Sequence, residues 1–309
     1  MRDYPSGPRL LAGLGALVMA ATFGMLMPSG LLSQGYTLTA TVMLVTTIPL
    51  VAFLTLLALA PDALQRALRR FTRLDLRDRG HVAAAVVMAG TLYFVLGYGS
   101  LTNGAYAYEH EVVLGNEPVP ITGDDLFAGI MMNLVVLVLP AIFYVAMVHD
   151  GGPGKALERL GLHGRNASRA LFIGFASALG VLFVIALLSY GIEATDIEVP
   201  ENERALQIAK SVTVLGAFGI AVGASVSEEV FFRGFLQPRI GMFGQAVFFA
   251  LAHLSYVNVL EIVVTFTLAL LFGIIYRMTG NLLAPMAGHF LFNLLMLLAG
   301  IYAPTAEPA

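Results

Sequence analysis

The feature that most constrains the fold of this 309-residue chain is a succession of apolar runs, each approaching or exceeding the length that crosses a bilayer. A membrane-spanning helix needs about 20 apolar residues. Such runs occupy 9–32, 38–60, 82–102, 126–148, 170–191, 208–227, 243–256, 259–278 and 282–302. The seventh run is short, which leaves eight or nine crossings open. Because backbone polar groups in lipid must be satisfied within the segment, we expect an all-α polytopic transmembrane bundle of about eight spans. It forms a single integral membrane domain over 1–309.

Composition agrees with a membrane protein and narrows the chemistry. Hydrophobic residues make up 58% of the chain and charged residues 12%, which no ordinary soluble domain approaches. The net charge of −3 is too small to suggest a nucleic-acid partner, so membrane lipids are the expected surroundings. The absence of cysteine excludes thiol catalysis, disulfides and thiolate metal sites. Any chemistry must therefore come from carboxylates, histidines or hydroxyls, and the sequence leaves the oligomeric state open.

Basic residues are unevenly distributed among the loops. Arginine and lysine concentrate in 61–81 and 149–169, whereas 103–125 contains neither. The positive-inside rule then predicts that the N terminus, 61–81 and 149–169 are cytoplasmic. Arginine outnumbers lysine fifteen to two, which hints at a GC-rich prokaryote and hence at a prokaryotic plasma membrane.

The segment 61–81 has two interpretations. Apolar residues fall at helical spacing between its arginines, at Leu64, Ala67, Leu68, Phe71 and Leu74. This pattern is typical of an amphipathic helix that lies in the headgroup plane. The alternative is a solvated cytoplasmic loop that only sets orientation. Neither interpretation gives the segment a catalytic role.

Adjacent glutamates, Glu228 and Glu229, follow the sixth apolar run, and Arg233 comes shortly after them. A carboxylate near the centre of a span costs about 2.5 kcal/mol or more, so two of them need compensation or a chemical role. Glu229 and Arg233 are four residues apart, so on a helix they share a face and can pair. Glu228 is turned about 100° away, and we expect it to face another helix.

Later spans carry three further polar residues. His253 belongs to the seventh run, while His289 and Asn293 lie four residues apart in the last one. All three, like Glu228, lie seven to eleven residues from the predicted cytoplasmic end of their span. At about 1.5 Å per residue, this is roughly 10–17 Å below the cytoplasmic surface. Isolated polar groups in lipid are costly, so this shared depth predicts a polar site inside the bundle.

These residues resemble, in order, the three signature motifs of the CPBP family. This family, also called Abi, comprises intramembrane glutamic endopeptidases, among them CAAX prenyl proteases and bacteriocin-processing enzymes. The motifs are Glu228-Glu229-x-x-x-Arg233, Phe249-x-x-x-His253 and His289-x-x-x-Asn293. The resemblance implies a catalytic core at 208–302, in the C-terminal four helices. The membrane helices of 1–207 match only as generic spans.

The resemblance also implies roles for the site residues. Glu228 resembles the residue that activates a water molecule for attack on the scissile peptide bond, and His253 resembles its partner. His289 and Asn293 are similar to the pair that donates hydrogen bonds to the oxyanion. The remaining two positions of the first motif, Glu229 and Arg233, resemble residues that brace the first glutamate.

Elementary chemistry agrees with these roles. A carboxylate and an imidazole in a partly dry cavity can share the work of a general base, and an amide and an imidazole N–H suit an oxyanion. We therefore expect an intramembrane endopeptidase that needs no cofactor. Its substrate is a membrane-anchored protein or a peptide, cleaved near the cytoplasmic face. Nothing in the sequence specifies whether that substrate is prenylated.

Three alternatives compete with this hypothesis. Glu228, His253 and His289 could instead hold a catalytic zinc ion, because one carboxylate and two histidines form a known zinc set. Intramembrane carboxylates and histidines also build proton relays, which would make the chain a proton-coupled transporter. A third alternative is a non-catalytic membrane scaffold or immunity protein. The clustering of the polar residues in the C-terminal third favours the protease.

Overall fold

The computed structural model describes residues 4–69, 73–119, 122–149, 152–193 and 203–303, and these contain helices and no strands. Eight of the described helical segments are long and apolar enough to cross a membrane, as the sequence predicts. They are Ser6–Ser33, Thr37–Leu59, Arg79–Val113, Gly123–Val148, Ala167–Leu187, Val214–Tyr256, Val259–Thr279 and Leu283–Tyr302. The chain is a multi-pass membrane protein with an all-α fold.

Several of these segments are built from consecutive helical elements. The N-terminal half contains α1 (Ser6–Ala21), η1 (Thr22–Leu26), α2 (Met27–Ser33), α3 (Thr37–Leu59), α4 (Pro61–Leu68), α5 (Arg79–Leu92), η2 (Tyr93–Thr102), α6 (Asn103–Tyr108), η3 (Glu109–Val113), α7 (Gly123–Asn133), η4 (Leu134–Val138) and α8 (Leu139–Val148). The C-terminal half contains α9 (Gly152–Arg159), α10 (Ala167–Glu193), α11 (Glu203–Ser211), α12 (Val214–Glu228), η5 (Glu229–Leu236), α13 (Gln237–Leu251), η6 (Leu254–Tyr256), α14 (Val259–Thr279) and α15 (Leu283–Tyr302).

The segment Val214–Tyr256 is not one straight helix. At Gly241 the backbone has φ 80° and ψ 167°, a conformation that favours glycine and breaks the helical path. The chain reverses there, so that α13 packs against η5 and against α14. The predicted runs 208–227 and 243–256 therefore belong to two helical stretches joined by this turn. The sequence left eight or nine crossings open because these two stretches can be counted as one crossing or as two.

The predicted start of the sixth span is wrong. Residues 203–211 form the separate helix α11, and α12 begins only at Val214. Thr213 caps α12, because its hydroxyl accepts a hydrogen bond of 3.1 Å from the backbone N–H of Gly216. An N-cap threonine satisfies an otherwise unpaired helix N–H, so the boundary falls at this residue.

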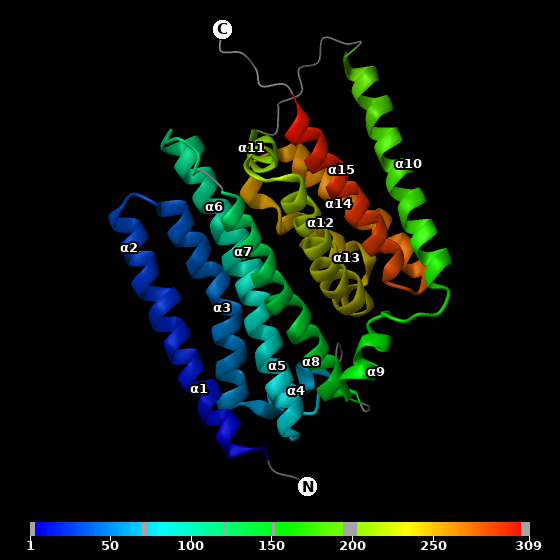
Figure 1. Ribbon diagram of the computed structural model, residues 1–309. Coiled ribbons are helices and arrows are strands. Elements are labelled where there is room, and N and C mark those ends of the chain that lie inside the picture. Colours follow the sequence, from blue (N-terminus) through cyan, green and yellow to red (C-terminus); the bar gives the residue numbers. More distant parts are fainter. Residues whose placement is uncertain (1–3, 70–72, 120–121, 150–151, 194–202, 304–309) are drawn as a thin grey trace.

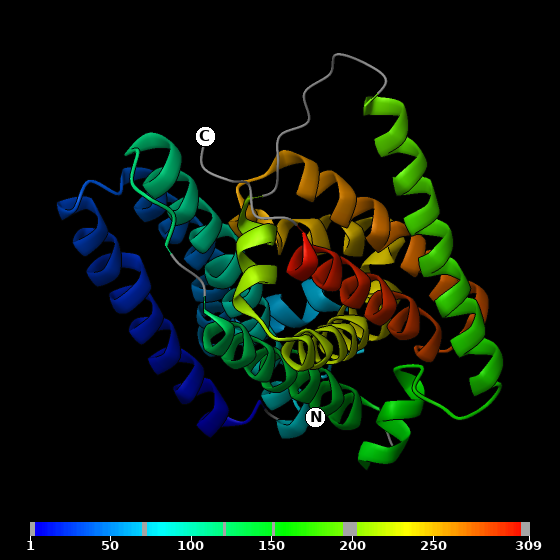
Figure 2. The same cartoon turned by 45° about the horizontal axis from the view of Figure 1, so that its top comes forward.

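The two basic segments lie at one end of the molecule. Figure 1 shows α4, α9 and the start of α1 together at one end, and α2, α6 and the end of α15 toward the other. The same view places α10 at the outer edge beside α15, and Figure 2 keeps that arrangement. The gathering of 61–69 with α9 agrees with the predicted sidedness of these segments.

The amphipathic segment is shorter than its pattern suggests. Helix α4 ends at Leu68, and Phe71 lies outside the described residues. Leu64 and Leu74 are buried, at 5% and 6% exposure, against other side chains of the protein. Leu64, Leu68 and Leu74 therefore pack against other parts of the fold, whereas Ala67 of the same face is exposed.

The largest apolar core surrounds η5. Val230, Phe231 and Phe232 are at most 2% exposed and pack with residues of α5, α8 and α13. On α12, Ala217 and Ala221 are fully buried, and a Cβ on Gly223 would meet Ile130 of α7 at 2.1 Å. Small residues let membrane helices approach closely. They let one face of α12 pack closely inside the bundle, whereas Leu215 and Phe218 on the same helix are exposed.

Candidate active site

The first glutamate motif lies where α12 passes into η5, a widened helical segment of the π type. Such segments are frequent at functional sites, but η1, η2, η3 and η4 are of the same type, so the helix type alone does not mark the site. Glu229 and Arg233 are both fully buried, and Arg233 Nη1 lies 2.9 Å from Glu229 Oε1. This is the ion pair that their four-residue spacing predicts. A buried charge without a partner is strongly destabilising, so each of these residues requires the other.

Aromatic rings complete the surroundings of Arg233. Its guanidinium carbon lies 4.5 Å from the ring centroid of Phe249 on α13 and 5.8 Å from that of Phe272 on α14. No guanidinium nitrogen makes a well-aligned hydrogen bond within the described part of the chain. Arg233 is thus held by the charge of Glu229 and by cation–π attraction. Its side chain has no surface exposed to solvent.

His289 on α15 lies beside both glutamates. Its Nδ1 is 2.8 Å from Glu229 Oε1, and its Nε2 is 3.9 Å from Glu228 Oε2. The imidazole stacks on Phe272, with ring centroids 5.7 Å apart and an angle of 18° between the planes. The sequence pairs His289 with Asn293 as an oxyanion donor. The structure adds a contact with Glu229 that the spacing along α15 does not reveal.

Glu228 is the partly open member of the cluster. Its side chain is 16% exposed, whereas that of Glu229 is fully buried. Its Oε2 is nevertheless buried and makes no hydrogen bond to any described residue. A carboxylate oxygen in this position is available to accept a proton or a hydrogen bond from a reactant.

His253 comes just after the end of α13. Its Nδ1 lies 2.9 Å from the carbonyl oxygen of Phe249. A carbonyl only accepts, so Nδ1 carries the hydrogen, and in the neutral ring Nε2 keeps the lone pair that can accept a proton. No direct hydrogen bond or ion pair joins His253 to Glu228 in the described structure. The predicted bridge of one water molecule between them stays a prediction.

The comparisons with known proteins concern this same C-terminal region. Residues 210–295 match the family described as type II CAAX prenyl endopeptidase, Rce1-like. This segment is an Rce1-like domain. It contains all six predicted site residues, and the resemblance drawn from the three motifs is confirmed for it. The Rce1-like family is a family of peptidases.

One curated relative is found in Bacillus subtilis (strain 168). It is YpbD, an uncharacterized protein that is 41% identical over 69 residues. The aligned stretch covers 22% of this chain and 36% of YpbD, so the similarity is confined to part of both proteins. No solved structure matches the chain.

The residues of the Rce1-like domain do not fit the alternative zinc site. That site requires Glu228, His253 and His289 to converge as three ligands. No group of three or more histidine, aspartate or glutamate side chains with metal-binding geometry occurs among the described residues. Nδ1 of His289 contacts Glu229, and Nδ1 of His253 contacts a carbonyl. Histidines that bind a metal often hold their other ring nitrogen in the same way, so the case against the zinc site rests on the missing three-ligand group alone.

Asn293 stands apart from the other site residues. It lies on α15 one turn after His289, is half-buried, and makes no hydrogen bond to another described residue. Its amide hydrogens are therefore free to be donated. No hydrogen bond joins Asn293 to Glu228 or His253, which are both described residues, so its role in the oxyanion stays a prediction.

Sequence reasoning named Phe249 in the second motif without giving it a role, and it missed Phe272. Phe249 contacts Arg233, and its ring centroid lies 4.9 Å from that of His253 and 6.1 Å from that of His289. The four-residue spacing to His253 was a usable signal for this residue. Phe272 carries no such signal, because α14 contributes no polar residue to the motifs.

Proposed function

We propose that this protein is an intramembrane endopeptidase that hydrolyses a peptide bond of a membrane-associated protein or peptide near the cytoplasmic face. The observation that carries the proposal is the free, buried Oε2 of Glu228 beside a buried cluster formed by Glu229, Arg233 and His289. A carboxylate with an unused lone pair in such a place serves as a general base. The Rce1-like domain supports the same reaction class.

In this reaction Glu228 and His253 together act as the general base. A water molecule gives a proton to this base while its oxygen forms a bond to the scissile carbonyl carbon. The carbonyl π electrons move onto oxygen and form the oxyanion. When the oxyanion collapses, the C–N bond breaks, and the stored proton passes to the leaving amine. The products are a carboxylic acid and an amine, so atoms and charges balance without a cofactor.

His289 and Asn293 stabilise the oxyanion in this proposal. Nδ1 of His289 lies 2.8 Å from Glu229 and can donate a hydrogen bond to it. Nε2 lies on the side of Glu228, where its hydrogen can be donated to the oxyanion. Electrostatic preorganisation of this kind is usually the largest single contribution to catalysis.

The cytoplasmic location follows from the arginine-rich loops. If 61–81 and 149–169 are cytoplasmic, a reporter fused after Arg79 will behave as internal, and one fused at Gly115 as external. A paired alkaline phosphatase and green fluorescent protein assay measures this. The reverse pattern would place the site near the outer face, and the substrates would then be proteins or peptides on that side of the membrane.

The central experiment is the substitution Glu228→Gln, which keeps shape and removes the base. The full-length protein is purified in detergent and given two fluorescence-quenched peptides, one ending in a farnesylated CAAX sequence and one without a prenyl group. We expect wild-type protein to cleave at least one peptide and Glu228→Gln to lose about 100- to 10,000-fold in rate.

The matched control is Glu117→Gln, the same chemical change at an exposed glutamate. It should leave the rate unchanged, and circular dichroism should show both variants folded. Wild-type rates in Glu228→Gln, or no cleavage of either peptide by the wild-type protein, would contradict the proposal. Activity that is lost on chelation and restored by zinc would support the metal alternative.

A further inference from the structure

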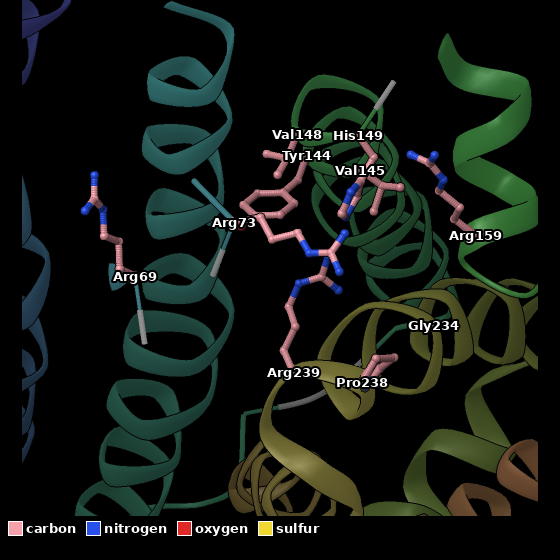
Figure 3. A pocket seen from close by; sticks show the side chains of 10 residues that line it. All are labelled: Arg69, Arg73, Tyr144, Val145, Val148, His149, Arg159, Gly234, Pro238 and Arg239. Carbon is pink, nitrogen blue, oxygen red and sulfur yellow. The ribbon is translucent and has the colours of Figure 1, made fainter. Parts of the chain in front are cut away.

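A second polar region, separate from the glutamate cluster, lies at the end of the molecule that holds α4 and α9. It is a cavity of about 650 Å³ bounded by the end of α8, the chain before α5, α9 and the start of α13. Its lining comprises Arg69, Arg73, Tyr144, Val145, Val148, His149, Arg159, Gly234, Pro238 and Arg239, as Figure 3 shows. We refer to it as the basic cavity.

The charge of the basic cavity is one-sided. Four arginines and one histidine line it, and no carboxylate of the described residues does. None of the four arginines forms an ion pair with another described residue; the arginine ion pairs of the described structure involve Arg77, Arg204 and Arg233. Like charges brought together without counter-charge repel one another. Solvent screens part of this repulsion, because Arg69, Arg73 and Arg159 are exposed, and a bound anion would relieve the part that remains at the half-buried Arg239.

Arg239 is held in place independently of any ligand. Its Nη1 donates a hydrogen bond of 2.5 Å to the carbonyl oxygen of Phe235. Its guanidinium carbon lies 4.0 Å from the ring centroid of Phe235 and 5.1 Å from that of Tyr144. One edge of the guanidinium is therefore fixed by the protein, and the remaining N–H groups are left to donate. An arginine ordered in this way loses little entropy when it binds an anion.

The electrostatics of His149 agree with this description. Burial lowers the pKa of His149 below its ordinary value. The nearby charges of Arg159 and Arg239 lower that pKa further, as do those of Arg73 and His81 to a smaller extent. The described side chains with the largest electrostatic effect on His149 are thus all basic. The interior of the cavity has a positive potential that no described side chain neutralises.

Arginines near the cytoplasmic surface also serve to orient membrane proteins, but that role does not require them to converge. Here residues from three separate segments point to one space. Figure 3 shows the side chains of Arg73 and Arg239 extending toward the middle of the cavity, whereas Arg69 extends away from them. The observation to explain is this convergence on a space large enough for a ligand.

We propose that the basic cavity binds a phosphate group. A carboxylate is satisfied by one bidentate guanidinium, whereas Arg73, Arg159 and Arg239 together offer charge and donors for the several oxygens of a phosphate. Two sources share this chemistry, the headgroup of an anionic phospholipid in the adjacent leaflet and a free phosphate compound. The site is distinct from the proposed hydrolytic centre and does not depend on it.

Isothermal titration calorimetry on the full-length protein in detergent tests the proposal. The probes are soluble dihexanoyl phosphatidic acid and inorganic pyrophosphate, with sodium chloride added to equalise ionic strength. We expect one saturable site per chain. Arg239→Gln and Arg73→Gln should each weaken binding at least about tenfold, because each removes a charge-assisted hydrogen-bond donor. Binding of both probes identifies the phosphate group as sufficient, and binding of phosphatidic acid alone identifies a lipid headgroup.

Arg165→Gln is the matched control, since Arg165 is exposed, carries the same charge and does not line the cavity. It should change the affinity by less than about twofold. Arg73 is also exposed, so its variant keeps the test valid if Arg239→Gln folds poorly. Absence of binding, equal binding of succinate, or equal weakening by Arg165→Gln would overturn the proposal.

Discussion

Two arginines lie six residues apart on one stretch of chain and meet opposite surroundings. Arg233 is fully buried and receives its counter-charge from Glu229 in the preceding turn. Arg239 is half-buried, faces other arginines across the basic cavity and has no ion-pair partner among the described residues. The buried Arg233 is thus neutralised by a carboxylate of the protein itself. Arg239, at the edge of the bundle, is left for a bound anion to neutralise.

The first prediction contrasts these arginines directly through the stability of the protein. Arg233→Met strands Glu229 in the core and should lower the free energy of unfolding by about 3–5 kcal/mol. Arg239→Met removes a charge that repels its neighbours while keeping an apolar stem over Phe235, and should cost less than about 1 kcal/mol. Unfolding in mixed micelles of mild detergent and dodecyl sulfate measures both values. Equal losses would mean that the two sites do not differ in the way described.

The second prediction separates structural from catalytic groups within the glutamate cluster. Asn293 makes no hydrogen bond to a described residue, so Asn293→Ala should leave the unfolding transition unchanged. If Asn293 donates to the oxyanion, kcat should fall by about 100-fold or more while KM changes little. Steady-state kinetics on the cleaved peptide provide the test. An unchanged kcat would remove Asn293 from the site and leave His289 as the proposed donor.

The third and smallest effect concerns pH in the basic cavity. Because burial and neighbouring cations lower the pKa of His149, a bound anion should raise that pKa toward its ordinary value. Binding then takes up a proton, so affinity should increase as pH falls through the window just below about 6.5. We expect a gain below about tenfold, measured with dihexanoyl phosphatidylglycerol, whose phosphodiester does not titrate there.

His149→Gln should flatten this pH dependence, and His81→Gln should leave most of it. His81 is the other titrating neighbour of His149, and Arg73, Arg159 and Arg239 keep their charge throughout the range. If affinity rises equally in both histidine variants as pH falls, the pH dependence comes from another group.

Local features of the two regions were predictable from the sequence, and the features that depend on packing were not. The Glu229–Arg233 pair follows from helical spacing alone, because both residues lie on one helix. The contact of His289 with Glu229 depends on how α15 is rotated against α12, and no spacing encodes that rotation. The break before α12 had a usable signal in Thr213, a good N-cap residue.

The basic cavity illustrates the same limit over longer distances. The sequence identified arginines in 61–81 and 149–169 as markers of orientation. It gave no indication that Arg73 and Arg159 converge with Arg239, since they come from three segments that only the tertiary fold brings together. The zinc alternative was left open for a similar reason. Only the positions of His253 and His289 show that a three-ligand set is not assembled.

The pairing of Glu229 and Arg233 within one helix also bears on how the protein is made. Chains emerge from the ribosome N-terminal end first, and this pair is complete as soon as its own helical turn has formed. His289 follows Glu229 by 60 residues, so it reaches the lipid later. During that interval Arg233 alone offsets Glu229, the most deeply buried carboxylate among the described residues. The ion pair therefore acts as a built-in counter-charge for membrane insertion, before the catalytic cluster exists.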